Sequence, residues 1–176
     1  AEADVDNDVL KIMVFERHKA TGNIGKGFIK GFGLKSGAIA STVAHDAHNM
    51  IVIGTNDADM EMAAIELVKS QGGKVIVNNG EVVSKLPLPI AGLMSDQPFE
   101  TVLQQCHELK EGVKKIGCAL DDPFMTMAFL SLSVIPDLKI TDKGVFDVNK
   151  FDFIDIFDTE PVSYTHLRAH ETKANL

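Results

Sequence analysis

The chain has 176 residues, of which 45% are hydrophobic and 24% charged, a composition typical of one globular domain with a real core. Its 17 Lys and Arg against 25 Asp and Glu give a formal net charge of −8, so it lacks the basic footprint of a nucleic-acid-binding protein. Its apolar runs stop well short of the roughly 20 residues of a membrane span, and its acidic start is unlike a signal peptide. We expect a cytoplasmic protein with no nucleic-acid or membrane partner.

Three short runs rich in β-branched residues predict buried strands at residues 10–15, 37–44 and 50–54. The segment 22–37, between the first two runs, holds six glycines. Such a density predicts a loop whose backbone either adopts positive φ or approaches another group closely.

The next segment combines a helix with a hairpin. Asn56 or Asp57 can cap a helix that runs to Ser70 before a pair of glycines ends it. Residues 74–85 then contain two short strands around an Asn-Gly pair, which is the strongest sequence signal for a two-residue β-hairpin.

The second half of the chain predicts two more helices and further extended pieces. Asp96 can cap a long amphipathic helix over 97–116, and a short buried helix is expected at 124–132. Residues 135–140 and 144–157 read as extended. This order of elements favours an α/β (α+β) fold, a single layered domain with a mixed β-sheet, the hairpin and packed helices.

The two cysteines, Cys106 and Cys118, are too few for a disulfide framework and lack metal-ligand spacing, which favours buried thiols. The last segment, 161–176, differs in composition from the rest because it holds the only tyrosine and one of two arginines. It resembles a translated sequencing adapter, so we assign residues 1–160 to the domain and 161–176 to a non-native tail.

The densest polar cluster is AHDAHN, which places His45, Asp46, His48 and Asn49 between two predicted strands. Strand ends at loops are where binding sites are commonly built. The two histidines could share a metal, although a metal site normally needs three or four ligands. The alternatives are polar residues that line a site and structural histidines that only stabilise the fold.

A second cluster places Arg17, His18 and Thr21 at the start of the glycine-rich segment. Backbone amides of such a loop can hold an anion, but neither nucleotide-binding glycine pattern is present. The chain also lacks the G-x-S-x-G nucleophile elbow, so nucleophilic hydrolysis is not expected.

Three segments in order carry a resemblance to a known family: RHKATGNIGKGFIKGFGLKSGAIASTVAHDAHNMIVIGTNDADM at 17–60, LPLPIAGLMSD at 86–96 and DDPFMTMAFLSLSVIPDLKITDKGVFDV at 121–148. Together they resemble the C-terminal domain of bacterial adenine deaminases of the amidohydrolase superfamily. The match covers roughly residues 10 to 157.

The resemblance implies an enzyme of adenine catabolism and purine salvage that hydrolyses adenine to hypoxanthine and ammonia. It implies Mn or Fe in a (β/α)8 barrel that precedes this domain, and a homo-oligomer. The metal ligands and catalytic acid of that barrel have no counterpart in this chain, which does not begin with Met. We therefore expect a fragment with no catalytic residue, no metal and no deaminase turnover of its own.

We further predict that the polar residues of both clusters lie on the face turned toward the barrel or a neighbouring subunit. Two alternatives remain open: a free-standing metal- or small-molecule-binding module that uses His45 and His48, and a structural or oligomerisation domain without a site role. The residues predicted to line the site are Arg17, His18, Thr21, His45, Asp46, His48 and Asn49.

Overall fold

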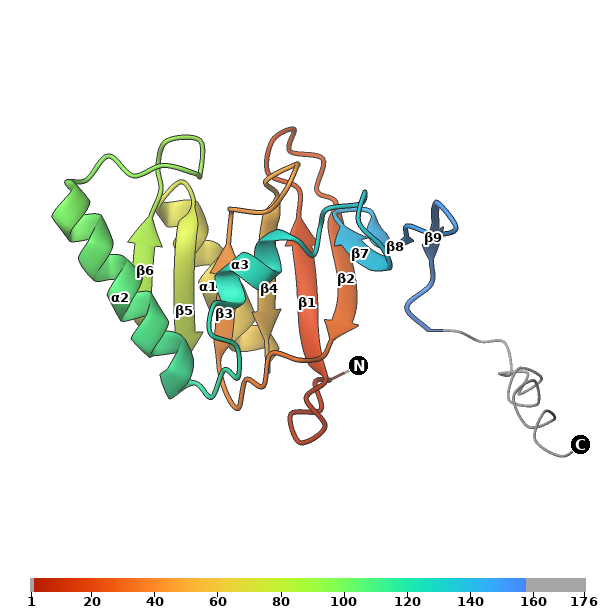
Figure 1. Ribbon diagram of the computed structural model, residues 1–176, viewed down its shortest axis with the longest axis horizontal. Helices are drawn as coiled ribbons and strands as arrows, with labels where there is room; N and C mark the ends of the chain where they lie inside the picture. The colour runs from red at the N-terminus through yellow and green to blue at the C-terminus, as the bar shows by residue number, and fades with distance from the viewer. Residues whose placement is uncertain (1, 158–176) are drawn as a thin grey trace, which may run out of the picture.

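A six-stranded sheet in the order β2-β1-β4-β3-β5-β6 forms the centre of the molecule in the computed structural model, which describes residues 2–157 (Figure 1). A smaller sheet, in the order β7-β8-β9, stands beside it. The strands of the large sheet are β1 (Leu10–Phe15), β2 (Ile24–Ile29), β3 (Ala38–Ser41), β4 (Met50–Gly54), β5 (Gly73–Asn78) and β6 (Glu81–Pro87).

The α+β class is confirmed, but every pairing in the large sheet is antiparallel, so the expectation of a mixed sheet is wrong in this respect. Helix α1 (Asp57–Lys69) joins β4 to β5, and those two strands do run in the same direction. Strand β3, however, lies between them and opposes both. A helical crossover therefore exists in the chain without creating a parallel neighbour.

The central strands are buried on both faces because helices cover both. Helix α1 packs on one face, while α2 (Phe99–Lys115) and α3 (Pro123–Ala128) pack on the other (Figure 1). Alternate residues of β3, β4 and β5 point to opposite faces. The α1 face holds Ala38, Ala40, Val52, Val75 and Val77, and the opposite face holds Ile39, Ile51, Ile53 and Ile76.

The hairpin at 74–85 is confirmed and is fastened to α1. Asn79 and Gly80 have φ of 52° and 74°, as a tight hairpin turn requires. The Asp59 carboxylate is buried and accepts the backbone N–H of Asn79 at 3.2 Å and of Gly80 at 2.8 Å. Asn56 is the observed cap of α1, and its side chain accepts the backbone N–H of Asp59.

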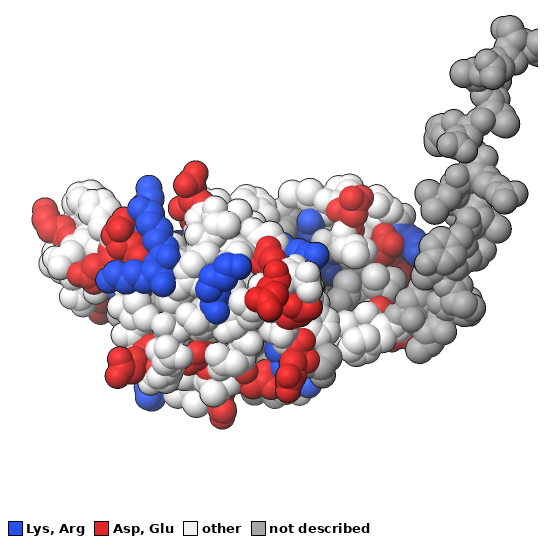
Figure 2. All heavy atoms as spheres, turned by 90° about the horizontal axis from the view of Figure 1, so that it is seen from below, with Lys and Arg blue, Asp and Glu red and all other residues white. Residues whose placement is uncertain are grey.

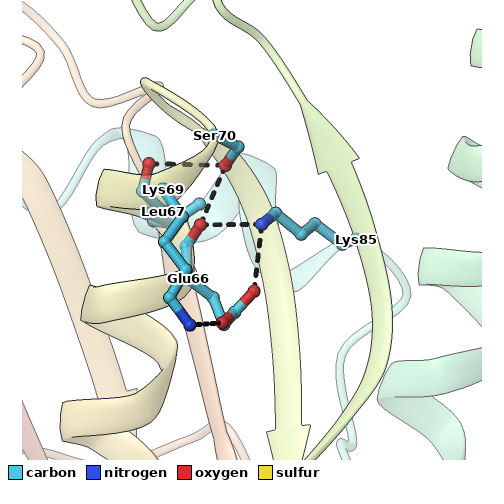
Figure 3. A network of polar contacts seen from close by, with 5 residues as sticks. All are labelled: Glu66, Leu67, Lys69, Ser70 and Lys85. Atoms are coloured by element: carbon cyan, nitrogen blue, oxygen red, sulfur yellow. Dashed lines mark hydrogen bonds and ion pairs between the residues drawn. The ribbon is translucent and has the colours of Figure 1, made fainter.

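A second fastening joins the end of α1 to the outermost strand, β6 (Figure 3). The Lys85 ammonium donates to the Glu66 carbonyl at 2.8 Å and lies 3.1 Å from the Glu66 carboxylate. Lys69 pairs with the same carboxylate at 2.7 Å, and the Ser70 hydroxyl donates to the Glu66 carbonyl at 2.9 Å. The side chain of Glu66 and its backbone carbonyl therefore bind three neighbours at once.

The glycine-rich segment is not a loop throughout, because residues 24–29 form strand β2. Gly25 and Gly27 are buried under the small sheet, which consists of β7 (Leu138–Thr141), β8 (Gly144–Asp147) and β9 (Asp152–Ile154). A Cβ atom at Gly25 would lie 1.7 Å from the backbone oxygen of Thr141. The second reading of the glycines, close approach of another group, is thus confirmed for this strand.

Two helix boundaries differ from the prediction. Helix α2 starts at Phe99 with Pro98 at its N-cap and no side-chain cap, so the Asp96 cap is wrong. The residue before a proline is disfavoured in helical conformation, which excludes Gln97 from the helix. Helix α3 is capped by Asp122 and ends at Ala128, four residues before the predicted end, and residues 129–131 form turns.

The cysteines lie in different environments. Cys118 is half-buried, and burial raises the pKa of its thiol. Cys106 is exposed, so the expectation that both thiols are buried is wrong for it. The sequence pattern places Cys106 on the apolar face of α2. In the structure, the buried residues of that helix are Leu109, Gly112 and Val113, and Cys106 is not among them.

Charges of both signs are intermixed on the end of the molecule shown in Figure 2, which carries no continuous basic patch among the residues drawn in colour. None of the helices in the described part of the chain has the length and apolarity needed to cross a bilayer. The predicted domain end at residue 160 and the predicted tail at 161–176 lie outside the described residues.

Candidate functional site

The predicted polar residues gather at one end of the large sheet, in the loops that follow β1 and β3. Strands β1 and β3 both oppose β4, so they run in the same direction and end at the same edge. That edge lies at the top of Figure 1. There the loops 16–23 and 42–49 contact the connector 88–98, because Arg17 and Thr42 donate hydrogen bonds to its carbonyls. The fold therefore unites the two sequence clusters, although Arg17 and His48 are 31 residues apart.

Arg17 holds this edge together through backbone carbonyls. Its Nε donates to the carbonyl of His48 at 2.5 Å, and a terminal nitrogen donates to the carbonyl of Ala91 at 2.8 Å. The guanidinium is pressed against Gly92, where a Cβ atom would lie 2.6 Å from it. Burial lowers the pKa of Arg17. Its role is to fix three loops in place, a use for which the planar, multidentate guanidinium is well suited.

His48 is held in the left-handed region at φ 51°, and its Nδ1 accepts the backbone N–H of Ala44 at 3.2 Å. Burial lowers the pKa of His48, and the positive charges of His45 and Arg17 lower it further. Nδ1 is an acceptor only in the neutral ring, so the hydrogen bond and the lowered pKa describe the same state. His18 contacts the next residue back, with its Nε2 2.6 Å from the carbonyl of Ala47.

His45 packs against His48 and against Phe129. Its ring centroid is 5.6 Å from that of His48 and 5.0 Å from that of Phe129, which follows α3. Its backbone N–H donates to the carbonyl of Ala128 at 2.7 Å, which anchors the loop on α3. The three imidazoles of His18, His45 and His48, together with the Arg17 guanidinium that holds their loop, are called the imidazole cluster below.

The imidazole cluster does not fit a metal ion as it stands. Within residues 2–157 no group of three or more His, Cys, Asp and Glu side chains is placed to hold one. His48 Nδ1 is already engaged with a backbone N–H, which leaves only one ring nitrogen on that residue. The third ring, that of His18, has its Nε2 against the carbonyl of Ala47. His45 and His48 are then only a pair, which falls short of the usual metal site.

Thr21 belongs to a separate contact made by Glu16, a residue that the sequence did not single out. The Glu16 carboxylate accepts the backbone N–H of Thr21 at 3.0 Å, its hydroxyl at 3.1 Å, and the backbone N–H of His18 and Lys19. These hydrogen bonds, led by that from Thr21, lower the pKa of Glu16 to about 2. Thr21 therefore helps to shape the loop and does not contact the imidazole cluster. The available signal in the sequence was Glu16 itself, an acidic residue a few positions before Thr21 and the glycines.

Asp46 and Asn49 line a cavity of about 190 Å³, here called the Asn49 cavity. Asn49 is buried, and its Nδ2 donates to Asp142 Oδ1 at 3.3 Å. Asp142 Oδ2 accepts from the Asn23 side chain at 3.2 Å. Sequence reasoning missed Asp142, since only the packing of the small sheet brings it here. The cavity is lined by Val14, Asp46, Ala47, Asn49, Ser131, Leu132, Ser133, Thr141 and Asp142.

The seven predicted residues thus separate into three groups: the imidazole cluster, the Glu16–Thr21 contact and the Asn49 cavity. The structure thus defines an α+β sheet domain with one polar end that is built from loops. The chain belongs to the adenine deaminase C-terminal domain family, whose model matches residues 1–152.

Curated relatives agree with this assignment. Adenine deaminase of Desulfatibacillum aliphaticivorans is 54% identical over 158 residues, which cover 90% of this chain and 28% of the relative. Adenine deaminase of Clostridium botulinum strain Langeland is 52% identical and also covers 90% of this chain. That of Brucella anthropi is 54% identical over 87% of it. The chain spans about a quarter of the length of these relatives.

Proposed function

We propose that this chain is the C-terminal domain of an adenine deaminase, which in its intact form hydrolyses adenine to hypoxanthine and ammonia. The observation that carries the proposal is the identity of 52–54% to relatives named adenine deaminase along about nine tenths of the chain. Hydrolytic deamination uses a metal-activated hydroxide, which Mn or Fe would supply in the barrel expected to precede this domain. Adenine, that barrel and further copies of the chain are the proposed partners.

Within that enzyme, the imidazole cluster and Asp46 are proposed to complete the substrate site or the contact with the barrel. The support is local rigidity. The loop that carries His45, Asp46 and His48 is fixed by hydrogen bonds of the Arg17 and His18 side chains to its carbonyls. It is also fixed by the hydrogen bond of the His45 backbone N–H to α3. Within residues 2–157, the His45 ring and the Asp46 carboxylate form no hydrogen bond, whereas the side chains of Arg17, His18, His48 and Asn49 do. A functional site needs groups that are held in position and still available to a ligand.

The test uses the intact enzyme with His45→Ala and Asp46→Ala. We expect each change to lower kcat/KM for adenine tenfold or more with the melting temperature nearly unchanged. Asp6→Ala is the control, since Asp6 is exposed in the turn before β1, away from the loop edge. Unchanged kcat/KM in both variants would reject the site role. Lost assembly or stability with full kcat would assign these residues to structure.

The isolated 176-residue chain provides a second test. We expect no release of ammonia from adenine, because no residue of the imidazole cluster is placed to activate water with a metal. Turnover above background would contradict this. Metal analysis after dialysis addresses the free-standing module: one tightly held metal per chain that is lost in His45→Ala would favour that reading.

A further inference from the structure

The Asn49 cavity contains polar atoms that the protein leaves without a partner. Asn49 is 6% exposed, and its Oδ1 has no hydrogen bond. The hydroxyl of Ser131, which lines the same cavity, is also buried and unpaired. Leaving such a group buried without a partner costs roughly 1–3 kcal/mol. Two of them at one cavity indicate a place where an external group completes the hydrogen bonding.

The orientation of the Asn49 amide is fixed by its neighbour. A carboxylate accepts hydrogen bonds only, so the amide nitrogen must face Asp142 and the oxygen must face away from it. The free atom of Asn49 is therefore an acceptor. A ligand that satisfies it must bring a donor.

The charge of the cavity points the same way. Asp46 and Asp142 contribute two carboxylates, and no Lys, Arg or His is among the lining residues. Neither carboxylate forms an ion pair within residues 2–157. A cleft lined by charge of one sign concentrates ligands of the opposite sign.

The cavity suits an organic cation better than a bare metal ion. Both oxygens of Asp142 already accept amide N–H groups, from Asn49 and from Asn23. The described part of the chain also lacks a group of three ligands that could surround a metal. The volume of about 190 Å³ is on the scale of cavities that hold one small ring.

From these observations we propose that the Asn49 cavity binds a small cation rich in N–H donors, of the ammonium or amidinium class. Donors of the ligand would meet the Asn49 oxygen, the Asp46 carboxylate and the remaining lone pairs of the Asp142 oxygens, each of which can accept a second N–H, with Ser131 accepting a further one. This goes beyond the proposed function, since it concerns binding by this chain alone. It holds or fails whether or not the intact enzyme deaminates adenine.

The test follows the side-chain amide signals of Asn49 and Asn23 by NMR in the 176-residue chain. Acetamidinium chloride and ammonium chloride are the probes. We expect saturable shifts with both, and tighter binding of acetamidinium because it fills more of the cavity. Tetramethylammonium carries the same charge without N–H groups and should cause no saturable shift. If it binds as well as acetamidinium, charge alone suffices and the proposal is wrong.

Variants separate the cavity from general charge effects. Asp46→Asn, which keeps the shape of an exposed side chain, should weaken acetamidinium binding at least fivefold, and Ser131→Ala at least twofold. Asp6→Asn makes the same charge change in the turn before β1 and should leave the affinity unchanged. Equal weakening by Asp6→Asn would overturn the proposal. So would shifts of the same signals by MgCl₂ at lower concentration, or no shift with either probe.

Discussion

Two regions of the molecule are held together in different ways. In the helix-covered half, which comprises β3, β5, β6, α1 and α2, large apolar side chains are buried between layers. In the small-sheet half, which comprises β2 and β7 to β9, contact depends on a backbone that approaches closely where side chains are absent. The first arrangement gains stability from buried area, and the second depends on the lack of a Cβ atom.

Exposure follows the same division. The residues of β3 are all buried, and β5 keeps four of its six residues buried. The small sheet leaves aromatic rings in solvent, with Phe151 80% and Phe153 47% exposed. Low burial predicts a lower free energy of local opening. We expect the small-sheet half to exchange its amide hydrogens well before the helix-covered half.

The largest expected effect is in the helix-covered half. Ile76→Ala removes a fully buried side chain from the face under α2, which should lower the free energy of unfolding by roughly 2–5 kcal/mol. Ile24→Ala makes the same change on β2, where the residue is 44% exposed, and should cost about 1 kcal/mol or less. Urea unfolding followed by circular dichroism measures both. Equal losses would remove the distinction between the two halves.

The next effect tests the glycine contact. Gly25→Ala places a Cβ atom 1.7 Å from the backbone oxygen of Thr141, and we expect a loss of roughly 1–3 kcal/mol. Gly27→Ala is the matched control, since its nearest neighbour is the flexible end of Ile140 at 3.2 Å. Hydrogen exchange should show lost protection in β7 and β8 for the first variant alone. Unchanged protection there would mean that the small sheet does not depend on this contact.

A smaller effect is expected at the start of α1. Asn56→Ala removes the side-chain acceptor for the N–H of Asp59 and should cost about 1 kcal/mol. Asn56→Ser keeps a capping oxygen and should retain most of the stability. Thermal unfolding compares the two. A serine variant as unstable as the alanine variant would show that the bond from Asn56 Nδ2 to Asp59, and not the cap, is what matters.

The smallest effect is confined to mild acid and to the loop edge. Because the pKa of His48 is below its ordinary value of 6.5, the unfolded chain takes up this proton more readily than the folded chain. Stability should therefore be unaffected above about pH 6.5 and fall as the pH drops through the folded pKa. His48→Asn tolerates the positive φ and cannot titrate, so it should flatten that fall. Parallel unfolding curves at pH 7.5 and 5.5 measure the difference, and an identical fall in both proteins would contradict it.

The sequence predicted features that depend on neighbouring residues, and it missed those that depend on contacts between distant segments. Periodicity and caps located α1, and the Asn-Gly pair located the hairpin, because these signals act within a few residues. Strand β2 was missed because its glycines Gly25 and Gly27 make room for Thr141 and Ile140, more than a hundred residues later. Asp142 was missed for the same reason. The grouping of Arg17 with His48 required the sheet order, which no local pattern contains.

The outermost position of β6 has a consequence for the behaviour of the protein in solution. An uncovered sheet edge offers free backbone groups with which a strand of another molecule can pair. Here Glu81 opens the strand with a charge, and Pro87 closes it with a residue that has no N–H to donate. Lys85 is drawn inward to Glu66 and fixes the strand against α1. These features oppose edge-to-edge pairing of β6 with a strand of another molecule.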